Sequence, residues 1–337
     1  MSRYAAAHAN PEGPGDARPT ALQIVQDEKL ENKLAGKVMV ITGVTSGIGL
    51  ETARALAATG ATLYLTVRDP EKAKTTLHDL MQSDPVFLVK MDNSSLASIR
   101  VAAADILAKS DNQVNILINN AGIMGVPSLQ ITDEGFEAHF VTNYLGHFLL
   151  FELLKPALIA SATPGFSSRV VNVSSSTVRS VDLSTSDNYN FEKKEYDAGV
   201  AYAQSKLAMV YMANEIERRY GHKGLHATSL HPGGIMTNIS RNVSPEIIAM
   251  VLEELKKSGA NVLKSPEQGA ATTVLAAIGK EWENKGGKYL EDCAESQRGR
   301  DDYDGFGVGW TRQMYDAENE ARLWKDSLKM AGLQDDM

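Results

Sequence analysis

Short apolar segments alternate with longer amphipathic ones along most of the chain. Residues 37–42 form a continuous apolar run, which is typical of a parallel strand covered on both faces. Similar runs predict strands at residues 61–67, 86–91, 114–119, 169–174 and 225–230. Helical spacing predicts helices at residues 47–59, 96–109, 133–160 and 200–220. Asp69 and Pro70 predict a further helix start, because Asp caps helices and Pro fits the first turn.

This alternation of strands and helices predicts an α/β fold, namely a single-domain, Rossmann-like, doubly wound parallel sheet. No linker of unusual composition divides the chain, so one domain is expected at residues 36–332. Residues 1–35 are expected to form a flexible N-terminal extension, because the start of the chain is rich in Pro and Gly and holds no apolar block.

Composition narrows the possible partners. The 337 residues include 34 Lys and Arg against 42 Asp and Glu, a net charge of −8. This charge argues against nucleic acid as a partner, because binding to a phosphate backbone needs a basic face. The seven histidines lack the spacing of metal ligands, so no metal is expected.

The apolar segments are also too interrupted to predict a membrane span, which needs about 20 predominantly apolar residues. The longest, residues 140–159, contains Asn143, His147, Glu152 and Lys155. Cys293 is the only cysteine, so no internal disulfide can form. Together with the lack of a signal-peptide pattern, these features predict a cytoplasmic protein without a membrane span.

The loop after the first strand, residues 42–49, reads Thr-Gly-Val-Thr-Ser-Gly-Ile-Gly. Its glycines allow the backbone to approach a pyrophosphate, whose charge is stabilised by the following helix N-terminus. Because the spacing is Gly-x-x-x-Gly-x-Gly rather than Gly-x-Gly-x-x-Gly, a purely structural turn is an alternative. The position directly after the first strand favours a phosphate site.

Arg68 follows the second strand, at the place where a dinucleotide's adenosine ribose is expected. A guanidinium suits a 2′-phosphate by charge and geometry, which favours NADP over NAD. Asp69 competes for a ribose hydroxyl, although its expected cap role explains it equally well. An exposed surface charge is the alternative interpretation of Arg68.

Tyr202 and Lys206 lie four residues apart in a predicted helix and therefore share one face. A tyrosine with its usual pKa of about 10 is a poor base at neutral pH, but a neighbouring ammonium stabilises the phenolate and lowers that pKa. The pair alone is a weak signal, since an exposed Tyr and Lys have the same spacing.

Small or polar residues end several predicted strands, at residues 92–93 (Asp-Asn), 119–122 (Asn-Asn-Ala-Gly) and 172–176 (Asn-Val-Ser-Ser-Ser). Ligands bind beyond the carboxyl ends of the strands in such sheets, so these residues predict one assembled site. A serine hydroxyl there can polarise a carbonyl oxygen, with ordinary turn chemistry as the alternative.

Together these motifs resemble the short-chain dehydrogenase/reductase family, from about residue 36 to residue 230 and more weakly to about residue 328. Residues 142–148, 265–270 and 286–290 are similar to its retinol-dehydrogenase-like branch, which includes fungal secondary-metabolite reductases. The resemblance implies that Tyr202 is the general acid/base. It also implies that Ser175 holds the substrate oxygen, with Ser174 and Ser176 as the other choices.

The remaining roles are also implied by the resemblance. Lys206 is expected to bind the nicotinamide ribose and lower the pKa of Tyr202, and Asn143 to position a water in a proton relay. Thr45 or Ser46 joins Arg68 at the 2′-phosphate, Asp92 contacts adenine, Asn120 contacts the adenosine ribose, and Ile235 and Thr237 flank the nicotinamide. The full implied cofactor set is Gly43, Thr45, Ser46, Gly47, Ile48, Gly49, Arg68, Asp92, Asn93, Asn120, Gly122, Tyr202, Lys206, Ile235 and Thr237.

The sequence thus predicts an NADP-dependent oxidoreductase that transfers hydride to or from a small substrate. A cofactor-binding regulator without turnover is an alternative, but it is expected to lack one catalytic position. A sugar-nucleotide epimerase or dehydratase is disfavoured by the spacing of the glycine loop.

The family resemblance also suggests the substrate side. Residues 238–264 are expected to form a lid, and its apolar positions suggest a hydrophobic ketone, aldehyde or secondary alcohol; an amphipathic surface helix is the alternative. These positions are Ile247, Ile248, Val251, Leu252 and Leu255. A polar insertion at residues 181–196 bears on substrate shape, and a dimer or tetramer is expected.

Overall fold

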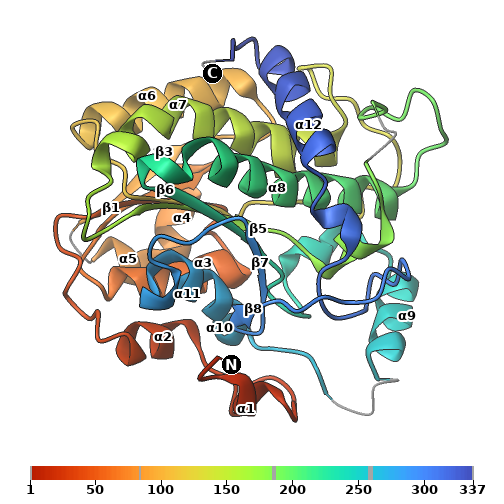
Figure 1. Ribbon diagram of the computed structural model, residues 1–337, viewed down its shortest axis with the longest axis horizontal. Coiled ribbons are helices and arrows are strands. Elements are labelled where there is room, and N and C mark those ends of the chain that lie inside the picture. The colour runs from red at the N-terminus through yellow and green to blue at the C-terminus, as the bar shows by residue number, and fades with distance from the viewer. Residues whose placement is uncertain (1, 83–84, 184–186, 257–260, 336–337) are drawn as a thin grey trace.

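A single sheet runs through the protein in the computed structural model, which describes residues 2–82, 85–183, 187–256 and 261–335. Within these residues the sheet has eight strands in the order β3-β2-β1-β4-β5-β6-β7-β8 (Figure 1). The strands are β1(Val38–Thr42), β2(Thr62–Val67), β3(Val86–Lys90), β4(Ile116–Asn119), β5(Ser168–Val173), β6(Leu225–Leu230), β7(Lys288–Glu291) and β8(Ala294–Glu295). All pairs are parallel except β7 with β8. The predicted doubly wound parallel sheet is confirmed.

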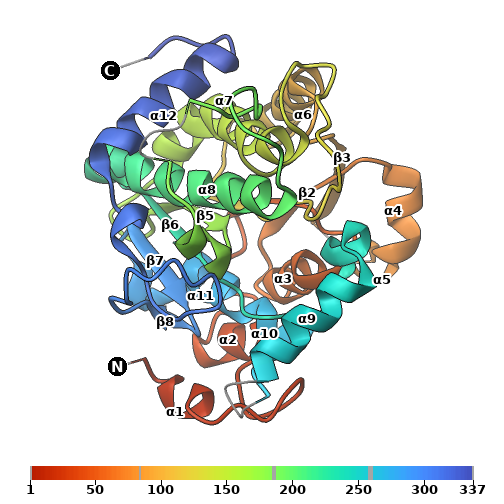
Figure 2. The same ribbon diagram turned by 90° about the vertical axis from the view of Figure 1, so that its right-hand side faces the viewer.

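Helices cover both faces of this sheet (Figures 1 and 2). One layer holds α6(Leu96–Lys109), α7(Gly146–Ser161), α8(Ala198–Tyr220) and α12(Ala317–Met330), and the other holds α2(Ala21–Asp27), α3(Gly47–Ala57) and α11(Ala271–Ile278). Val38 and Val40 of β1 pack in the first layer, whereas Met39 and Ile41 pack in the second. Burial on both faces explains why this strand is apolar at consecutive positions.

The N-terminal residues differ from the expected flexible extension. Thr20 accepts a hydrogen bond from Gln23 N and caps α2, and the helix buries Ile24 and Val25 against α3 and α11. Because these apolar residues are removed from water together with the helices they cover, folding of the segment is favourable. A shorter helix, α1(Ala5–His8), precedes α2 near the N-terminus (Figures 1 and 2).

The long predicted helix at residues 133–160 begins later than expected. Its first turns, η1(Phe140–Leu145), are π-helical and continue directly into α7. The Glu137 carboxylate accepts a hydrogen bond of 2.7 Å from Phe140 N, and this bond fixes the helix start. π-Helical turns inside helices are frequent at functional sites.

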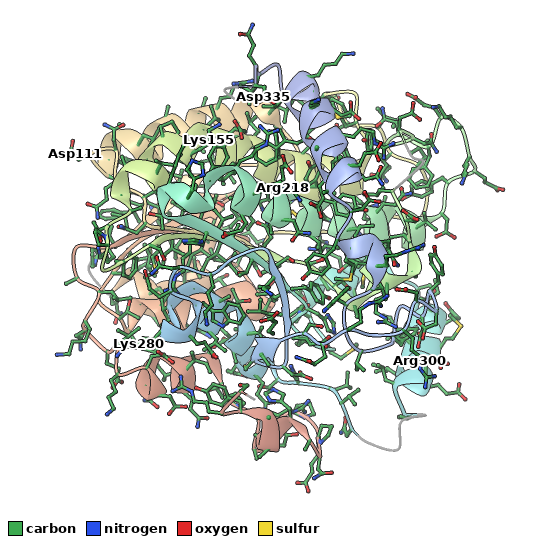
Figure 3. All side chains as sticks on the ribbon, viewed as in Figure 1. Asp111, Lys155, Arg218, Lys280, Arg300 and Asp335 are labelled. Atoms are coloured by element: carbon green, nitrogen blue, oxygen red, sulfur yellow. The ribbon has the colours of Figure 1, made fainter. Side chains whose placement is uncertain are left out.

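Among the described residues, the helix Phe140–Ser161 is long and apolar enough to span a membrane, yet 67% of its most apolar window is buried within the protein. Its polar residues have partners inside the domain. Lys155, labelled in Figure 3, lies 2.8 Å from Glu152 Oε2 and 3.2 Å from Tyr220 Oη. The helix is therefore a core helix of this fold.

Candidate active site

A cavity of about 850 Å³ lies at the carboxyl ends of the strands, where the sequence predicted a site. Its walls come from the glycine loop, the ends of β2, β4, β5 and β6, and α9(Pro245–Lys256). A cavity of this size is in the range of ligand sites in proteins. All the predicted catalytic and cofactor-binding residues line it except Asn143.

The glycine loop is held against the segment that follows β4. Gly43 has a φ of +71°, and a Cβ there would lie 2.6 Å from Ala121 Cα. A Cβ on Gly49 would lie 2.2 Å from Gly43 O. Only glycine fits at these two positions, so the loop sits close to its neighbours while its other side borders the cavity.

The glycine loop leads directly into the N-terminus of α3. Ser46 is its N-cap residue, but its side chain makes no capping hydrogen bond, so the first N–H groups of the helix have no side-chain acceptor there. Such a terminus stabilises a phosphate by both hydrogen bonding and the helix dipole. Gly47 and Ile48 of this turn border the cavity together with Thr45. The loop therefore fits a dinucleotide pyrophosphate.

Two side chains after β2, those of Arg68 and Asp69, are the candidates for contacting the adenosine ribose of a dinucleotide. The Asp69 carboxylate accepts a hydrogen bond of 3.1 Å from Lys72 N and caps α4(Pro70–Thr76), as the sequence predicted. Arg68 is exposed and borders the cavity. A cation is therefore available at this end of the cavity, whereas the adjacent carboxylate already serves the helix.

A buried hydrogen-bond network under the glycine loop was not predicted. Thr42 Oγ1 accepts bonds from Asn120 N (3.0 Å) and Ala121 N (2.9 Å) and lies 2.8 Å from His147 Nε2. Asn93 Nδ2 lies 2.8 Å from the same His147 nitrogen. His147 Nδ1 lies 2.8 Å from Asn143 O, so the imidazole connects the end of β1 and the segment after β3 to η1.

Burial lowers the pKa of His147 to about 4, so the ring is neutral at pH 7. A neutral ring can donate from Nδ1 to the carbonyl and accept at Nε2, which matches its partners. The one sequence signal for the network is the hydroxyl of Thr42 directly before Gly43.

Several predicted cofactor residues use their side chains within the protein. Asn120 Nδ2 donates to Thr42 O and Gly43 O, at 2.8 and 2.9 Å. Asp92 Oδ1 accepts bonds from the backbone and hydroxyl of Ser94. The side-chain amide of Asn93 faces His147. These residues therefore shape the cavity wall through local hydrogen bonds.

Asn143 likewise holds the backbone after β4. Its Oδ1 accepts a bond of 2.8 Å from Ile123 N, and its Nδ2 donates to Ile123 O at 3.0 Å and to Ser205 Oγ at 2.9 Å. A Cβ on Gly122 would lie 3.3 Å from Asn143 Oδ1 and 3.4 Å from Lys206 Nζ. Asn143 and Lys206 thus pack around the same glycine.

The three serines after β5 have different partners. Ser174 Oγ donates to Lys206 O at 2.8 Å and is buried. Ser176 N donates to His231 Nδ1 at 3.1 Å. Ser175 Oγ accepts from Thr177 Oγ1 at 3.0 Å and hydrogen-bonds with Tyr202. Of the three hydroxyls, the one on Ser175 is therefore paired with the tyrosine.

Tyr202 and Lys206 lie on the buried face of α8, with 8% and 2% of their surfaces exposed. Lys206 Nζ lies 5.9 Å from the centre of the Tyr202 ring and donates a bond of 2.9 Å to Val173 O. Burial raises the pKa of Tyr202 to about 12 although the bond with Ser175 lowers it, and burial lowers the pKa of Lys206 to about 8. In the protein alone the pKa of Tyr202 is therefore raised rather than lowered, because the effect of burial is larger than that of its neighbours.

The apolar positions of the predicted lid are divided between the cavity and the solvent. Ile248, Val251, Leu252 and Leu255 of α9 line the cavity, whereas Ile247 does not and is 49% exposed. Residues 257–260 of the predicted lid, and residues 184–186 of the polar insertion, lie outside the described residues.

Two other wall segments were missed by the sequence analysis: residues 306–308 and the N-terminal residues His8, Pro11 and Arg18. Residues 262–264, at the end of the predicted lid, also line the cavity. Residues 306–308 are held by Arg179, whose guanidinium donates to Val308 O and Gly309 O at 2.9 and 2.8 Å. Within the described ranges, no group of three or more His, Cys, Asp or Glu residues could hold a metal ion.

Comparisons with known proteins place these features in context. Residues 37–247 match the family model described as short chain dehydrogenase. The short-chain dehydrogenase/reductase prx1 of Penicillium roqueforti is 48% identical over 99% of this chain and 96% of its own. Retinol dehydrogenase 12 of Mus musculus is 36% identical over 90% of this chain and 88% of its own. A crystal structure of an uncharacterised protein from Mycobacterium paratuberculosis is 28% identical and covers 94% of this chain and 99% of its own, with a TM-score of 0.66.

Proposed function

The chain belongs to the short-chain dehydrogenase family of nicotinamide-dependent oxidoreductases, and from that premise we propose that it is an NADP(H)-dependent enzyme acting on a hydrophobic ketone, aldehyde or secondary alcohol. The observation that carries the proposal is the pairing of Ser175 with Tyr202 in the cavity that also holds the glycine loop.

The lining of this cavity supports the binding of NADP(H). The glycine loop and the N-terminus of α3 would hold the pyrophosphate, and Arg68 would bind the 2′-phosphate. Ile235 and Thr237, which are expected to flank the nicotinamide, also line the cavity, with Thr237 beside Gly47. The bound nicotinamide supplies or accepts the hydride.

In the proposed reaction the residues of this chain handle the proton. Because the pKa of Tyr202 is about 12, its hydroxyl is protonated at neutral pH and can donate to a carbonyl oxygen during reduction. The Ser175 hydroxyl would hold that oxygen in place. The Lys206 ammonium would stabilise the phenolate left on Tyr202. Asn143 would support this arrangement through its bonds to Ile123, with the expected water relay as part of the proposal.

The apolar residues of α9 support a hydrophobic substrate, and the retinol dehydrogenase relative from mouse is consistent with a small one. A role in secondary metabolism, a cytoplasmic location and a dimeric or tetrameric state are part of the same proposal. The alternative of a regulator without turnover is not favoured, because Tyr202, Lys206 and Ser175 are all present at the cavity.

The test is to mix the purified protein with NADPH and a panel of apolar ketones and aldehydes and follow the absorbance of the reduced nicotinamide. Tyr202→Phe is expected to lower kcat by at least about 100-fold, the usual contribution of a general acid, with NADPH affinity nearly unchanged. Tyr303→Phe, at an exposed position, serves as the control. Tight NADPH binding by the wild type without turnover of any carbonyl or alcohol would instead support the regulator.

A further inference from the structure

The N-terminal segment reaches the cavity, and the proposed reaction does not account for it. Arg18 lines the same cavity as Tyr202, although these residues are far apart in the sequence. It is only 4% exposed. A buried charge is costly unless it is paired and hydrogen-bonded, so the surroundings of Arg18 indicate what it holds.

All three nitrogens of the Arg18 guanidinium have partners. Nε donates to Asp16 Oδ1 at 2.8 Å, Nη1 to Val262 O at 2.9 Å, and Nη2 to Leu263 O at 2.6 Å and Gly13 O at 3.2 Å. Two of these carbonyls belong to the segment between α9 and α10. Arg18 therefore joins the N-terminal segment to a cavity wall more than 240 residues away in sequence.

Asp16 and Gln268 complete this connection. Gln268 Nε2 donates to Asp16 Oδ1 at 2.9 Å, and Gln268 Oε1 accepts from Gly15 N at 3.0 Å. Burial alone would raise the pKa of Asp16, but the hydrogen bonds from Arg18 and from backbone N–H groups hold it well below its usual value. The carboxylate is thus charged at neutral pH. We call Asp16, Arg18 and Gln268 the N-terminal clamp.

The wall that the clamp holds is connected to the segment expected to flank the nicotinamide. Lys264 N donates to Gly234 O at 2.9 Å, and Lys264 Nζ lies 3.3 Å from Pro232 O and 2.7 Å from Asp292 Oδ1. A Cβ on Gly234 would lie 3.3 Å from Leu263 Cδ2. A shift of residues 262–264 therefore alters the cavity beside residues 232–235.

We infer that Arg18 is a positioning residue of the active site, and that the N-terminal clamp sets the substrate wall formed by residues 262–264. The inference rests on the proposed function for its kinetic consequence. The clamp itself rests on the hydrogen bonds alone. The N-terminal segment is thus part of the substrate site rather than an appendage to the domain.

The test compares Arg18→Met with Arg3→Met. Methionine keeps an unbranched apolar side chain but removes the donors. The Arg3 control lies in the same segment, is partly exposed, pairs with the buried Glu28 and does not line the cavity. A second variant, Arg18→Met with Asp16→Asn, removes the partner charge as well, so that an unpaired buried carboxylate does not decide the outcome.

For a carbonyl that the wild type reduces, Arg18→Met is expected to raise KM about tenfold, corresponding to one lost hydrogen bond to a charged group. The expected change in kcat and in NADPH affinity is less than about threefold, because Tyr202 and the glycine loop are untouched. A loss of stability with unchanged KM in both Arg18 variants would overturn the inference.

Hydrogen exchange gives a readout that does not depend on turnover. The amides of residues 261–269 are expected to exchange faster in both Arg18 variants than in Arg3→Met, whether or not NADPH is present. Equal exchange in all the proteins would overturn the clamp. If the wild type reduces no carbonyl but exchange responds as expected, the proposed function fails while the clamp stands.

Discussion

Thr42→Val isolates the hydrogen-bond network under the glycine loop. The substitution keeps the shape of the side chain and removes only its hydroxyl. Asn120 N and Ala121 N then lose the acceptor that lies 3.0 and 2.9 Å away, whereas His147 Nε2 keeps its bond to Asn93. The perturbation therefore removes the partner of two backbone donors.

The size of the effect follows from these two donors. An unsatisfied buried donor costs about 1–3 kcal/mol, and because Asn120 and Ala121 are half-buried we take the lower half of that range for each. Thr42→Val should therefore lower the free energy of unfolding by about 2–4 kcal/mol. It should also weaken NADPH binding, because the same loop carries Gly43.

Urea unfolding and NADPH titration measure the two effects. The matched control is Thr52→Val in α3, where a fully buried threonine hydroxyl has no hydrogen-bond partner among the described residues. That control should be neutral or slightly stabilising. If Thr42→Val and Thr52→Val unfold at the same urea concentration, the network does not support the loop and the reasoning is refuted.

Two further predictions concern charged residues of the cavity. Burial lowers the pKa of Lys206 from 10.5 to about 8, which at about 1.4 kcal/mol per pKa unit costs the folded state about 3 kcal/mol below pH 8 and nothing above pH 10.5. Lys206→Met should therefore abolish turnover, yet raise the free energy of unfolding at pH 7 by up to about 3 kcal/mol, less the contribution of the lost hydrogen bond to Val173 O. This gain in stability should shrink as the pH rises from 8. Denaturation curves that show no gain at pH 7 would contradict the prediction. Arg68→Ala should weaken NADPH by about 10- to 100-fold, as for a lost charge-assisted hydrogen bond, and leave NADH nearly unchanged. Equal losses for both nucleotides in a fluorescence titration would contradict the 2′-phosphate assignment.

The central strands and helices were predictable because the spacing of their apolar residues in the sequence reflects which positions are buried. The range predicted for β6 and for α6 coincides with the observed one. In both elements the apolar positions follow the period of the secondary structure. By contrast, β7 and β8 have only four and two residues, too few for a period to be recognised.

The N-terminal clamp could not be predicted for a different reason. Composition rich in Pro and Gly indicates a loop, but the order of this loop depends on acceptors supplied by Val262, Leu263 and Gln268. Such long-range partners leave no local periodicity. The same holds for His147, whose partner Thr42 is 105 residues away.

That the candidate site residues line one cavity was predictable, whereas their detailed interactions were not. The cavity brings Ser175, Tyr202 and Lys206 together, as expected from the ends of the strands. The direction of the Tyr202 pKa was not predictable, because burial is a property of the folded protein. Nor does the spacing of residues in the sequence reveal that the side-chain amides of Asn120 and Asn93 form hydrogen bonds within the protein.

The positions of the two chain ends matter for anyone who wishes to attach this protein to a surface or a purification tag. Ser2 Oγ donates a bond of 2.7 Å to Cys293 O, in the hairpin beside the cavity. Asp335, labelled in Figure 3, lies on the opposite side of the molecule. A linker joined at Ser2 would therefore disturb a contact beside the cavity, whereas one joined at Asp335 starts on the other side of the molecule.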